Sequence, residues 1–216
     1  MANYENKGFR FLPARLIIFT LDLFDRLSRV FVRLKIHPNW LSLAGLISGL
    51  VVGICYATHQ PFLALVFLAF CGMLDILDGK VATNGNKKTL FGAVFDSSLD
   101  RHSEFAIYLG LGFYYKTHWI LWVLALAFLG STMVSYTRAR AESLGVDCRV
   151  GMMQRAERIV ILLLGNFIGL VFNCFNQAMI VSVVFIALGA NITAIQRLAY
   201  VYNYERRKKN NPGNLG

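Results

Sequence analysis

Long apolar segments constrain this chain more than any other feature of its sequence. A helix needs roughly 20 apolar residues to cross a bilayer, and only fully hydrogen-bonded backbone is tolerated in lipid. Of the 216 residues, 56% are hydrophobic and 16% are charged, which leaves no room for a separate soluble domain. The predicted fold is therefore all-α, a polytopic membrane protein with six transmembrane helices. They are placed at Leu41–Ala57, Phe62–Leu77, Phe91–Tyr115, Trp119–Ser135, Ile159–Phe175 and Ala178–Ala199.

The segment ahead of the first span, Phe11–Lys35, mixes apolar and charged residues with a helical period. Its charges argue against a span, so we predict an amphipathic helix at the membrane interface. The apolar residues that share one face are Leu16, Phe19, Leu23, Leu27, Val30 and Leu34. Pro38 ends the pattern, because the residue before a proline disfavours helix. The predicted organisation is an N-terminal cytoplasmic segment (1–40), a six-helix transmembrane domain (41–200) and a basic cytoplasmic tail (201–216).

Basic residues give the chain a formal net charge of +10. No motif typical of nucleic-acid binding accompanies them, and we expect anionic lipid headgroups and phosphorylated substrates as partners instead. Of the 22 Lys and Arg residues, all but Lys116 lie in the N-terminal stretch, the C-terminal end, or in and beside the two long polar links, near Gly79–Leu90 and Thr137–Arg158. The positive-inside rule then predicts a multi-pass protein of the cell membrane with both termini and both links in the cytoplasm.

Four aspartates gather at the cytoplasmic ends of the second and third predicted spans. Asp75 and Asp78 are spaced i, i+3, and Asp96 and Asp100 are spaced i, i+4, so each pair lies on one helix face. A helical hairpin would bring the two faces together. Four carboxylates need counter-charge there, and Mg²⁺ or Mn²⁺ prefers oxygen ligands. Pairing with nearby Lys or Arg, or helix capping, is the alternative, and it suits one aspartate better than four.

The spacing of these aspartates resembles a known signature. Gly79, Ala82 and Gly92 lie among the four aspartates, and the whole resembles D-x-x-D-G-x-x-A-R-x(8)-G-x(3)-D-x(3)-D of the CDP-alcohol phosphotransferases, also called CDP-alcohol phosphatidyltransferases. Seven of the eight fixed positions match with every spacing kept, and Thr83 stands where the family has Arg. The resemblance also covers the six-helix layout, the cytoplasmic site and the N-terminal helix.

The resemblance implies a membrane enzyme that transfers a substituted phosphate from a CDP-lipid to an alcohol. Two Mg²⁺ or Mn²⁺ ions would be held by Asp75, Asp78, Asp96 and Asp100, with Asp100 as general base. It implies a CDP-lipid-binding set of Pro38, Asn39, Asp78, Gly79, Ala82, Thr83 and Gly92. Pro38 and Asn39 have a simple turn as an equal alternative. Lys80, Lys87 or Lys88 could supply the charge that Thr83 lacks. A homodimer is implied by the resemblance alone.

The acceptor is indicated by a second stretch. Ser135–Glu142 resembles the S-Y-x-[KR]-A-R-A-E segment of phosphatidylinositol phosphate synthases. By that resemblance Arg138, Arg158 and Arg197 would bind the phosphate of inositol phosphate, since guanidinium groups hold phosphate through forked donors. These arginines could instead extend to lipid phosphates at the membrane surface. The implied reaction moves a phosphatidyl group from CDP-diacylglycerol, or a similar CDP-lipid, to inositol phosphate and releases CMP.

Three alternatives stay open at this point. Glycerol 3-phosphate or inositol could be the acceptor of the same chemistry. An ion-coupled transporter could use intramembrane carboxylates, although such groups usually lie near the bilayer midplane and between repeated halves. A non-catalytic membrane subunit is the third, which the Thr83 departure keeps open.

Overall fold

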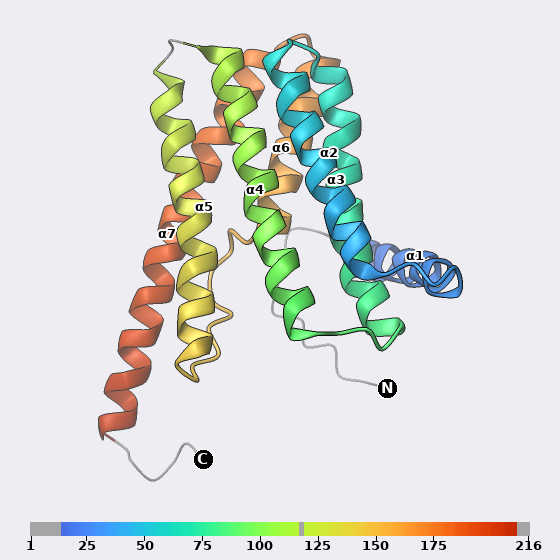
Figure 1. Cartoon of the computed structure of the whole chain (residues 1–216). Coiled ribbons are helices and arrows are strands. Elements are labelled where there is room, and N and C mark those ends of the chain that lie inside the picture. Colours follow the sequence, from blue (N-terminus) through green and yellow to red (C-terminus); the bar gives the residue numbers. More distant parts are fainter. Residues whose placement is uncertain (1–13, 117–118, 211–216) are drawn as a thin grey trace. The chain divides into compact units, whose positions relative to one another are not determined.

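The computed structural model describes the backbone of residues 14–116 and 119–210, and the side chains of 22–116 and 119–210. All regular structure in these ranges is α-helical, without a strand (Figure 1). The helices are α1 (Ala14–Arg33), α2 (Pro38–Ala57), α3 (Pro61–Asn84), α4 (Leu90–Tyr115), α5 (Ile120–Ser143), α6 (Arg155–Val171) and α7 (Phe175–Asn210). Each of the six predicted apolar segments is covered largely by one of α2–α7.

Four of these helices, α2, α3, α5 and α7, are long and apolar enough to cross a membrane. The other two are less clear-cut. α4 has 26 residues but carries Asp96, Asp100, Arg101 and Glu104, and α6 has only 17 residues. For α4 and α6 the membrane crossing stays a prediction.

Three helices extend beyond the apolar segments that marked them in the sequence. α3 continues from Leu77 to Asn84, α5 from Ser135 to Ser143, and α7 from Ala199 to Asn210. The polar link predicted near Gly79–Leu90 is therefore shorter than expected, because its first half, residues 79–84, belongs to α3. Hydropathy marks where the lipid-facing part of a helix ends, whereas the helix itself ends only where its backbone hydrogen bonds end.

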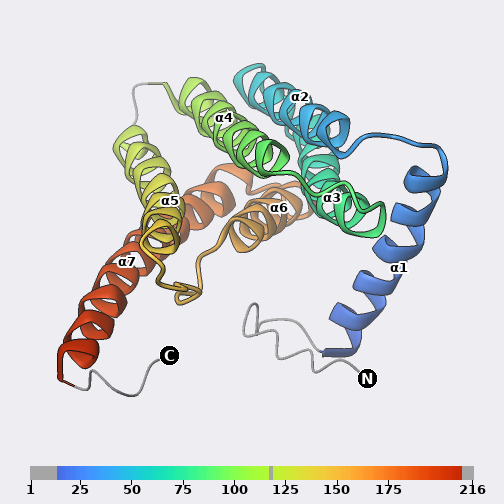
Figure 2. The ribbon, with the colours of Figure 1, turned by 60° about the horizontal axis from the view of Figure 1, so that its bottom comes forward.

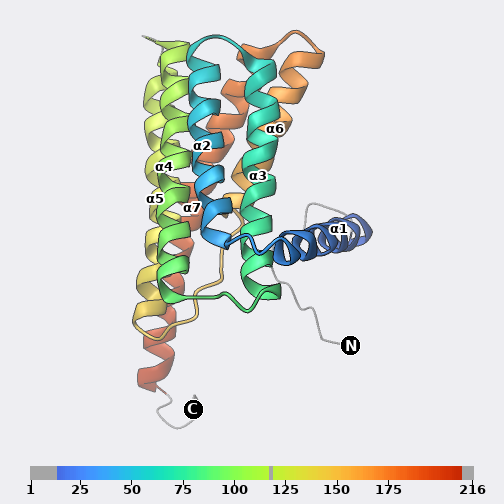
Figure 3. The ribbon, with the colours of Figure 1, turned by 45° about the vertical axis from the view of Figure 1, so that its right-hand side comes forward.

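The chain divides into two compact units, which we describe separately. The first contains α1–α4 and residues 170–173. In it α2 packs against both α3 and α4, and Figure 3 shows the three helices side by side. Glycines let α2 and α4 approach closely: a Cβ atom on Gly110 would overlap the backbone of Gly53. Small residues at such crossings are typical of helices packed within membranes.

Helix α1 packs against α3 and lies across its end instead of alongside it (Figures 2 and 3). Phe24 is buried in a cluster with Leu41, Leu77 and Val81. On the predicted apolar face, Leu27 packs against this cluster, whereas Leu23, Val30 and Leu34 are exposed, as residues facing lipid would be. Residues Phe11–Pro13 and the side chains of Leu16 and Phe19 lie outside the described part of the chain. The helix is present, and its place at the interface stays a prediction.

The second unit contains α5, α6 up to Gly169, and α7. α5 and α7 pack against each other (Figure 1). Their contact buries Val134, Ala190 and Ala194 together with Met153 from the α5–α6 link. The Asn191 side-chain amide of α7 donates a hydrogen bond of 3.0 Å to the Leu126 carbonyl of α5. Near its end α7 also packs, through Val201 and Tyr204, against buried Ala141 of α5 and buried Val146 and Cys148 of the link.

Candidate active site

Three of the four predicted metal-binding aspartates lie together in the first unit. Asp75 and Asp78 come from the last turns of α3 and Asp96 from the beginning of α4. One carboxylate oxygen from each lies within 4.8 Å of the other two. Asp78 is buried, and Asp75 and Asp96 are half-buried. Asp100 lies one turn further along α4, is half-buried, and is outside this group.

The donor atoms of this group fit a hard divalent cation. All are carboxylate oxygens, which Mg²⁺ and Mn²⁺ prefer. The Oδ1 atom of Asp96 is buried and has no hydrogen-bond partner among the described residues. A buried carboxylate oxygen without a partner carries a large desolvation penalty, and three carboxylates this close repel one another. A cation held by Asp75, Asp78 and Asp96 would remove both penalties.

The beginning of α2 lies beside the beginning of α4. Pro38 is buried at the first helical position of α2, where a missing N–H does no harm. Thr89 caps α4 by accepting a hydrogen bond of 2.9 Å from the Gly92 backbone N–H. A Cβ atom on Gly92 would lie 2.9 Å from Thr89 Oγ1 and 3.4 Å from Asn39 Oδ1. Of the predicted donor-binding residues, Asn39 and Gly92 are therefore brought together.

The remaining donor-binding residues lie on the last turns of α3. A Cβ atom on Gly79 would meet nothing within 4 Å, so the space beside this glycine is open. Ala82 is half-buried, and Thr83 is exposed with its hydroxyl donating 2.8 Å to the Gly79 carbonyl. The open space at Gly79 is what a closely bound nucleotide would need.

Two of the lysines proposed to replace the family arginine have other contacts. The Nζ atom of Lys80 lies 3.7 Å from Asp25 Oδ1 on α1. Lys87 Nζ donates to the carbonyl oxygens of Lys35 and Ile36, at 3.5 and 3.4 Å, and so ties the α1–α2 connection to the α3–α4 link. Lys88 is exposed. Lys80 and Lys87 thus already have partners on α1 and on the α1–α2 connection.

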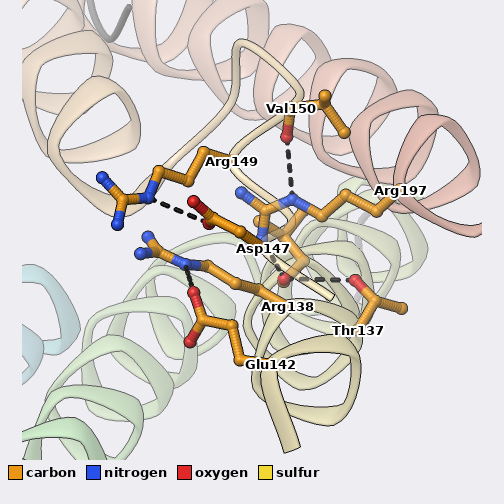
Figure 4. Close-up of polar contacts among 8 residues, drawn as sticks. Thr137, Arg138, Glu142, Asp147, Arg149, Val150 and Arg197 are labelled. Atoms are coloured by element: carbon orange, nitrogen blue, oxygen red, sulfur yellow. Dashed lines mark hydrogen bonds and ion pairs between the residues drawn. The ribbon is translucent and has the colours of Figure 1, made fainter. Parts of the chain in front are cut away.

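All three predicted acceptor-binding arginines lie in the second unit. Arg158 and Arg197 are only 1% and 2% exposed, which makes them the largest fully buried side chains described. Arg138, near the end of α5, is partly exposed and pairs with Glu142 at 2.8 Å (Figure 4). The positive charges of Arg138 and Arg158 both repel the charge of Arg197. The three guanidinium groups therefore lie near one another.

The buried arginines also hold the α5–α6 link in place, which the sequence did not indicate. Arg197 Nε donates 2.9 Å to the Val150 carbonyl, and its Nη1 atom donates to the Val134 carbonyl (Figure 4). Arg158 Nη1 donates 3.2 Å to the Met153 carbonyl. Gly151 lies between these contacts with a φ of 100°, a conformation that suits glycine. A glycine within a polar link was the only sequence signal of this tight turn.

The comparisons with known proteins agree with this geometry. The sequence model of the CDP-alcohol phosphatidyltransferase family matches residues 35–194. The archaetidylinositol phosphate synthase of Methanothermobacter thermautotrophicus is 39% identical over 171 residues, which cover 79% of this chain and 85% of that protein.

Two solved structures of the phosphatidylinositol phosphate synthase of Mycobacterium tuberculosis are also similar. The structure with CDP-DAG bound has a TM-score of 0.74 and 26% identity, and covers 84% of this chain and 94% of that one. The structure in complex with manganese and citrate has the same TM-score and identity, with coverages of 83% and 88%. Because the family match spans well over half of the sequence and includes the aspartate group, this chain belongs to the CDP-alcohol phosphatidyltransferase family.

Proposed function

We propose that this chain is a membrane enzyme of phospholipid synthesis that transfers a phosphatidyl group from CDP-diacylglycerol, or a similar CDP-lipid, to inositol phosphate and releases CMP. The observation that carries the proposal is the group of Asp75, Asp78 and Asp96, whose oxygens lie within 4.8 Å of one another. The names of its relatives support the acceptor, since both the archaeal and the mycobacterial protein are inositol phosphate lipid synthases.

Asp75, Asp78 and Asp96 would hold divalent metal, and Asp100 would complete a two-ion centre of Mg²⁺ or Mn²⁺. Bound there, the ions would neutralise the diphosphate of the donor and polarise its phosphoryl oxygens. The manganese complex of a relative supports a divalent cation. Pro38, Asn39, Gly79, Ala82, Thr83 and Gly92 would bind the cytidine and diphosphate of the donor along α2, α3 and α4.

The acceptor phosphate would be bound by Arg138, Arg158 and Arg197. The Arg138–Glu142 ion pair is partly exposed, and such pairs contribute little stability, so Arg138 can exchange Glu142 for a phosphate at low cost. Three guanidinium groups would favour a phosphorylated alcohol over a neutral one.

Asp100 would take the proton from the acceptor hydroxyl. The hydroxyl oxygen forms a bond to the β-phosphorus of the donor, the bond between that phosphorus and the bridging oxygen breaks, and CMP leaves with the bonding electron pair. Positioning and charge neutralisation supply most of the acceleration expected of such a site.

The membrane arrangement that we propose has six crossings, with α4 and α6 as the two less apolar ones. α1 would lie at the cytoplasmic interface, where its exposed Leu23, Val30 and Leu34 contact lipid. Both termini and the active site would be cytoplasmic, and the protein would be a homodimer.

The test is CMP release by the purified protein with Mg²⁺ and CDP-diacylglycerol or CDP-archaeol. Inositol 1-phosphate, inositol and glycerol 3-phosphate are compared as acceptors. We expect release that depends on inositol 1-phosphate and is abolished in Asp100→Asn. Asp22→Asn is the matched control, because Asp22 is exposed and pairs, among the residues whose side chains are described, with Arg26 of the same helix.

Release with glycerol 3-phosphate alone would keep the chemistry and overturn the acceptor. No release with any alcohol would contradict the proposed enzyme. Metal-dependent ion flux in liposomes without CMP release would indicate a transporter instead.

A further inference from the structure

One buried hydroxyl lies against the metal-binding group without belonging to it. The Ser42 Oγ atom on α2 donates a hydrogen bond of 2.8 Å to Oδ2 of Asp78 on α3. Ser42 is 8% exposed and Asp78 is 5% exposed, so water does not readily compete for this bond. The two residues are 36 positions apart in the chain, and only the packing of α2 against α3 brings them together.

The bond restrains the orientation of the Asp78 carboxylate. Asp75 and Asp96 both repel Asp78 electrostatically, and a carboxylate in that position would otherwise rotate away from its neighbours. The Ser42 hydroxyl uses one lone pair of the carboxylate. Because the carboxylate is planar, holding that oxygen in place also fixes where its other lone pairs point. Groups that orient metal ligands in this way typically change metal affinity by about 10- to 100-fold when they are removed.

The same helix also contributes to the candidate nucleotide site. Asn39 lies three residues before Ser42, so the two side chains share one face of α2. Asn39 lies beside Gly92 on α4, and Ser42 contacts Asp78 on α3. The first two turns of α2 therefore connect the donor-binding residues to the carboxylate group.

We propose that Ser42 is a positioning residue of the metal centre. Its hydroxyl holds the Asp78 carboxylate in the orientation that binds a divalent cation. The inference rests on the metal site of the proposed function and adds a residue outside the aspartate signature. Ser42 does not itself coordinate the cation or contact the reacting atoms.

The chain offers a matched control on the same helix. Ser48 is 6% exposed, and its hydroxyl donates 2.8 Å to the Phe67 carbonyl of α3. Ser42 and Ser48 are thus both buried serines of α2 that donate to α3. They differ in the acceptor, which is a carboxylate of the site for Ser42 and a backbone carbonyl for Ser48. Substitution by alanine removes a single oxygen atom at either position.

The experiment measures Mn²⁺ binding to the detergent-purified full chain, without substrates, from the EPR signal of free Mn²⁺. We expect Ser42→Ala to raise the dissociation constant about 10- to 100-fold, Ser42→Thr to restore tight binding, and Ser48→Ala to leave it unchanged. Helix content by circular dichroism and the elution volume show that each variant is folded. In CMP release, Ser42→Ala should need more Mg²⁺ for half-maximal activity and recover most of kcat at saturating Mg²⁺.

Mn²⁺ affinity in Ser42→Ala equal to that of the unsubstituted chain would overturn the inference and leave the proposed function intact. An equal loss in Ser48→Ala would also overturn it, because the effect would then be a general one of α2 packing. If the unsubstituted chain binds no Mn²⁺, the metal centre of the proposed function is itself wrong.

Discussion

The charged side chains of the candidate site include two groups with different partners. Asp75, Asp78 and Asp96 are crowded together, and one of their buried oxygens has no partner within the described ranges. Arg158 and Arg197 are instead satisfied in part by backbone carbonyls. The crowded carboxylates are typical of a metal site. The two buried arginines provide positive charge and also fix the backbone around them.

Arg138 differs from the other two arginines because it is partly exposed and pairs with the carboxylate of Glu142. We expect Arg138→Ala to raise the KM for inositol 1-phosphate about tenfold or more, as loss of a charge-assisted hydrogen bond does, with a smaller effect on kcat. Arg140→Ala is the control, since Arg140 is exposed on the same helix end. Steady-state CMP release measures both constants. Equal effects of the two substitutions would contradict the acceptor role.

Thr83 is the one departure from the family signature, and its exposed side chain leaves room for a longer one. We expect Thr83→Arg to lower the KM for the CDP-lipid, because a guanidinium group would add a donor for the diphosphate. Thr83→Ala should change this KM much less, since the threonine hydroxyl already donates to the Gly79 carbonyl of its own helix. CMP release measured against donor concentration tests both. An unchanged KM in Thr83→Arg would show that the position does not face the donor.

Helix α2 is the element that organises the first unit. It contacts α3 through Ser42 and α4 through Gly49 and Gly53, so its position fixes how the aspartates of those helices meet. The close approach requires glycine where backbones touch, and glycine elsewhere in a helix is unfavourable.

The α2–α4 crossing gives a stability prediction. In Gly110→Val the new side chain would overlap the backbone of Gly53, so α2 and α4 must separate, at a cost of about 1–3 kcal/mol or more. Gly45→Ala is the control, because a Cβ atom there would lie 3.9 Å from Leu74 Cβ, an ordinary contact. Thermal unfolding in detergent should show a lower midpoint for Gly110→Val only. A similar fall in Gly45→Ala would contradict the proposed cause.

Helix α1 is attached to α3 through Asp25. Its Oδ1 atom accepts 2.9 Å from the Asn84 side chain, and this bond, with the charges of Lys80 and Arg29, holds the pKa of Asp25 below its ordinary value. A lowered pKa means that the attachment contributes stability above the ordinary pKa, and that this contribution is lost as pH falls through the lowered value. We expect Asp25→Ala to reduce hydrogen-exchange protection of α1 at neutral pH.

The size of that reduction should diminish as the solution is acidified, because the unsubstituted chain then loses the same contribution. Asp22→Ala is the control, since the ion pair of Asp22 is with Arg26 of the same helix and not with α3. Protection factors, which correct for the intrinsic exchange rate at each pH, give the comparison. An identical response of both variants would show that Asp25 does not attach α1.

At the scale of the whole molecule, charge asymmetry decides the predicted orientation. Only Lys116, between α4 and α5, is assigned to the face opposite the other 21 basic residues. In intact cells we expect a cysteine at Lys116 to react with a membrane-impermeant maleimide. A cysteine at Arg207, near the end of α7, should react only after lysis. The unsubstituted chain gives the background from its own cysteines. The reverse pattern would overturn the orientation.

The sequence by itself determined the helices, their approximate places and the aspartate signature, because hydropathy and helical period are local properties of the chain. Only the tertiary structure decided how far α3, α5 and α7 extend and which residues support the site. Ser42 and Asp78 are 36 positions apart, Val150 and Arg197 are 47 apart, and Asp25 and Asn84 are 59 apart. Such pairs have no sequence pattern, since they depend on which helix faces pack together and at what register.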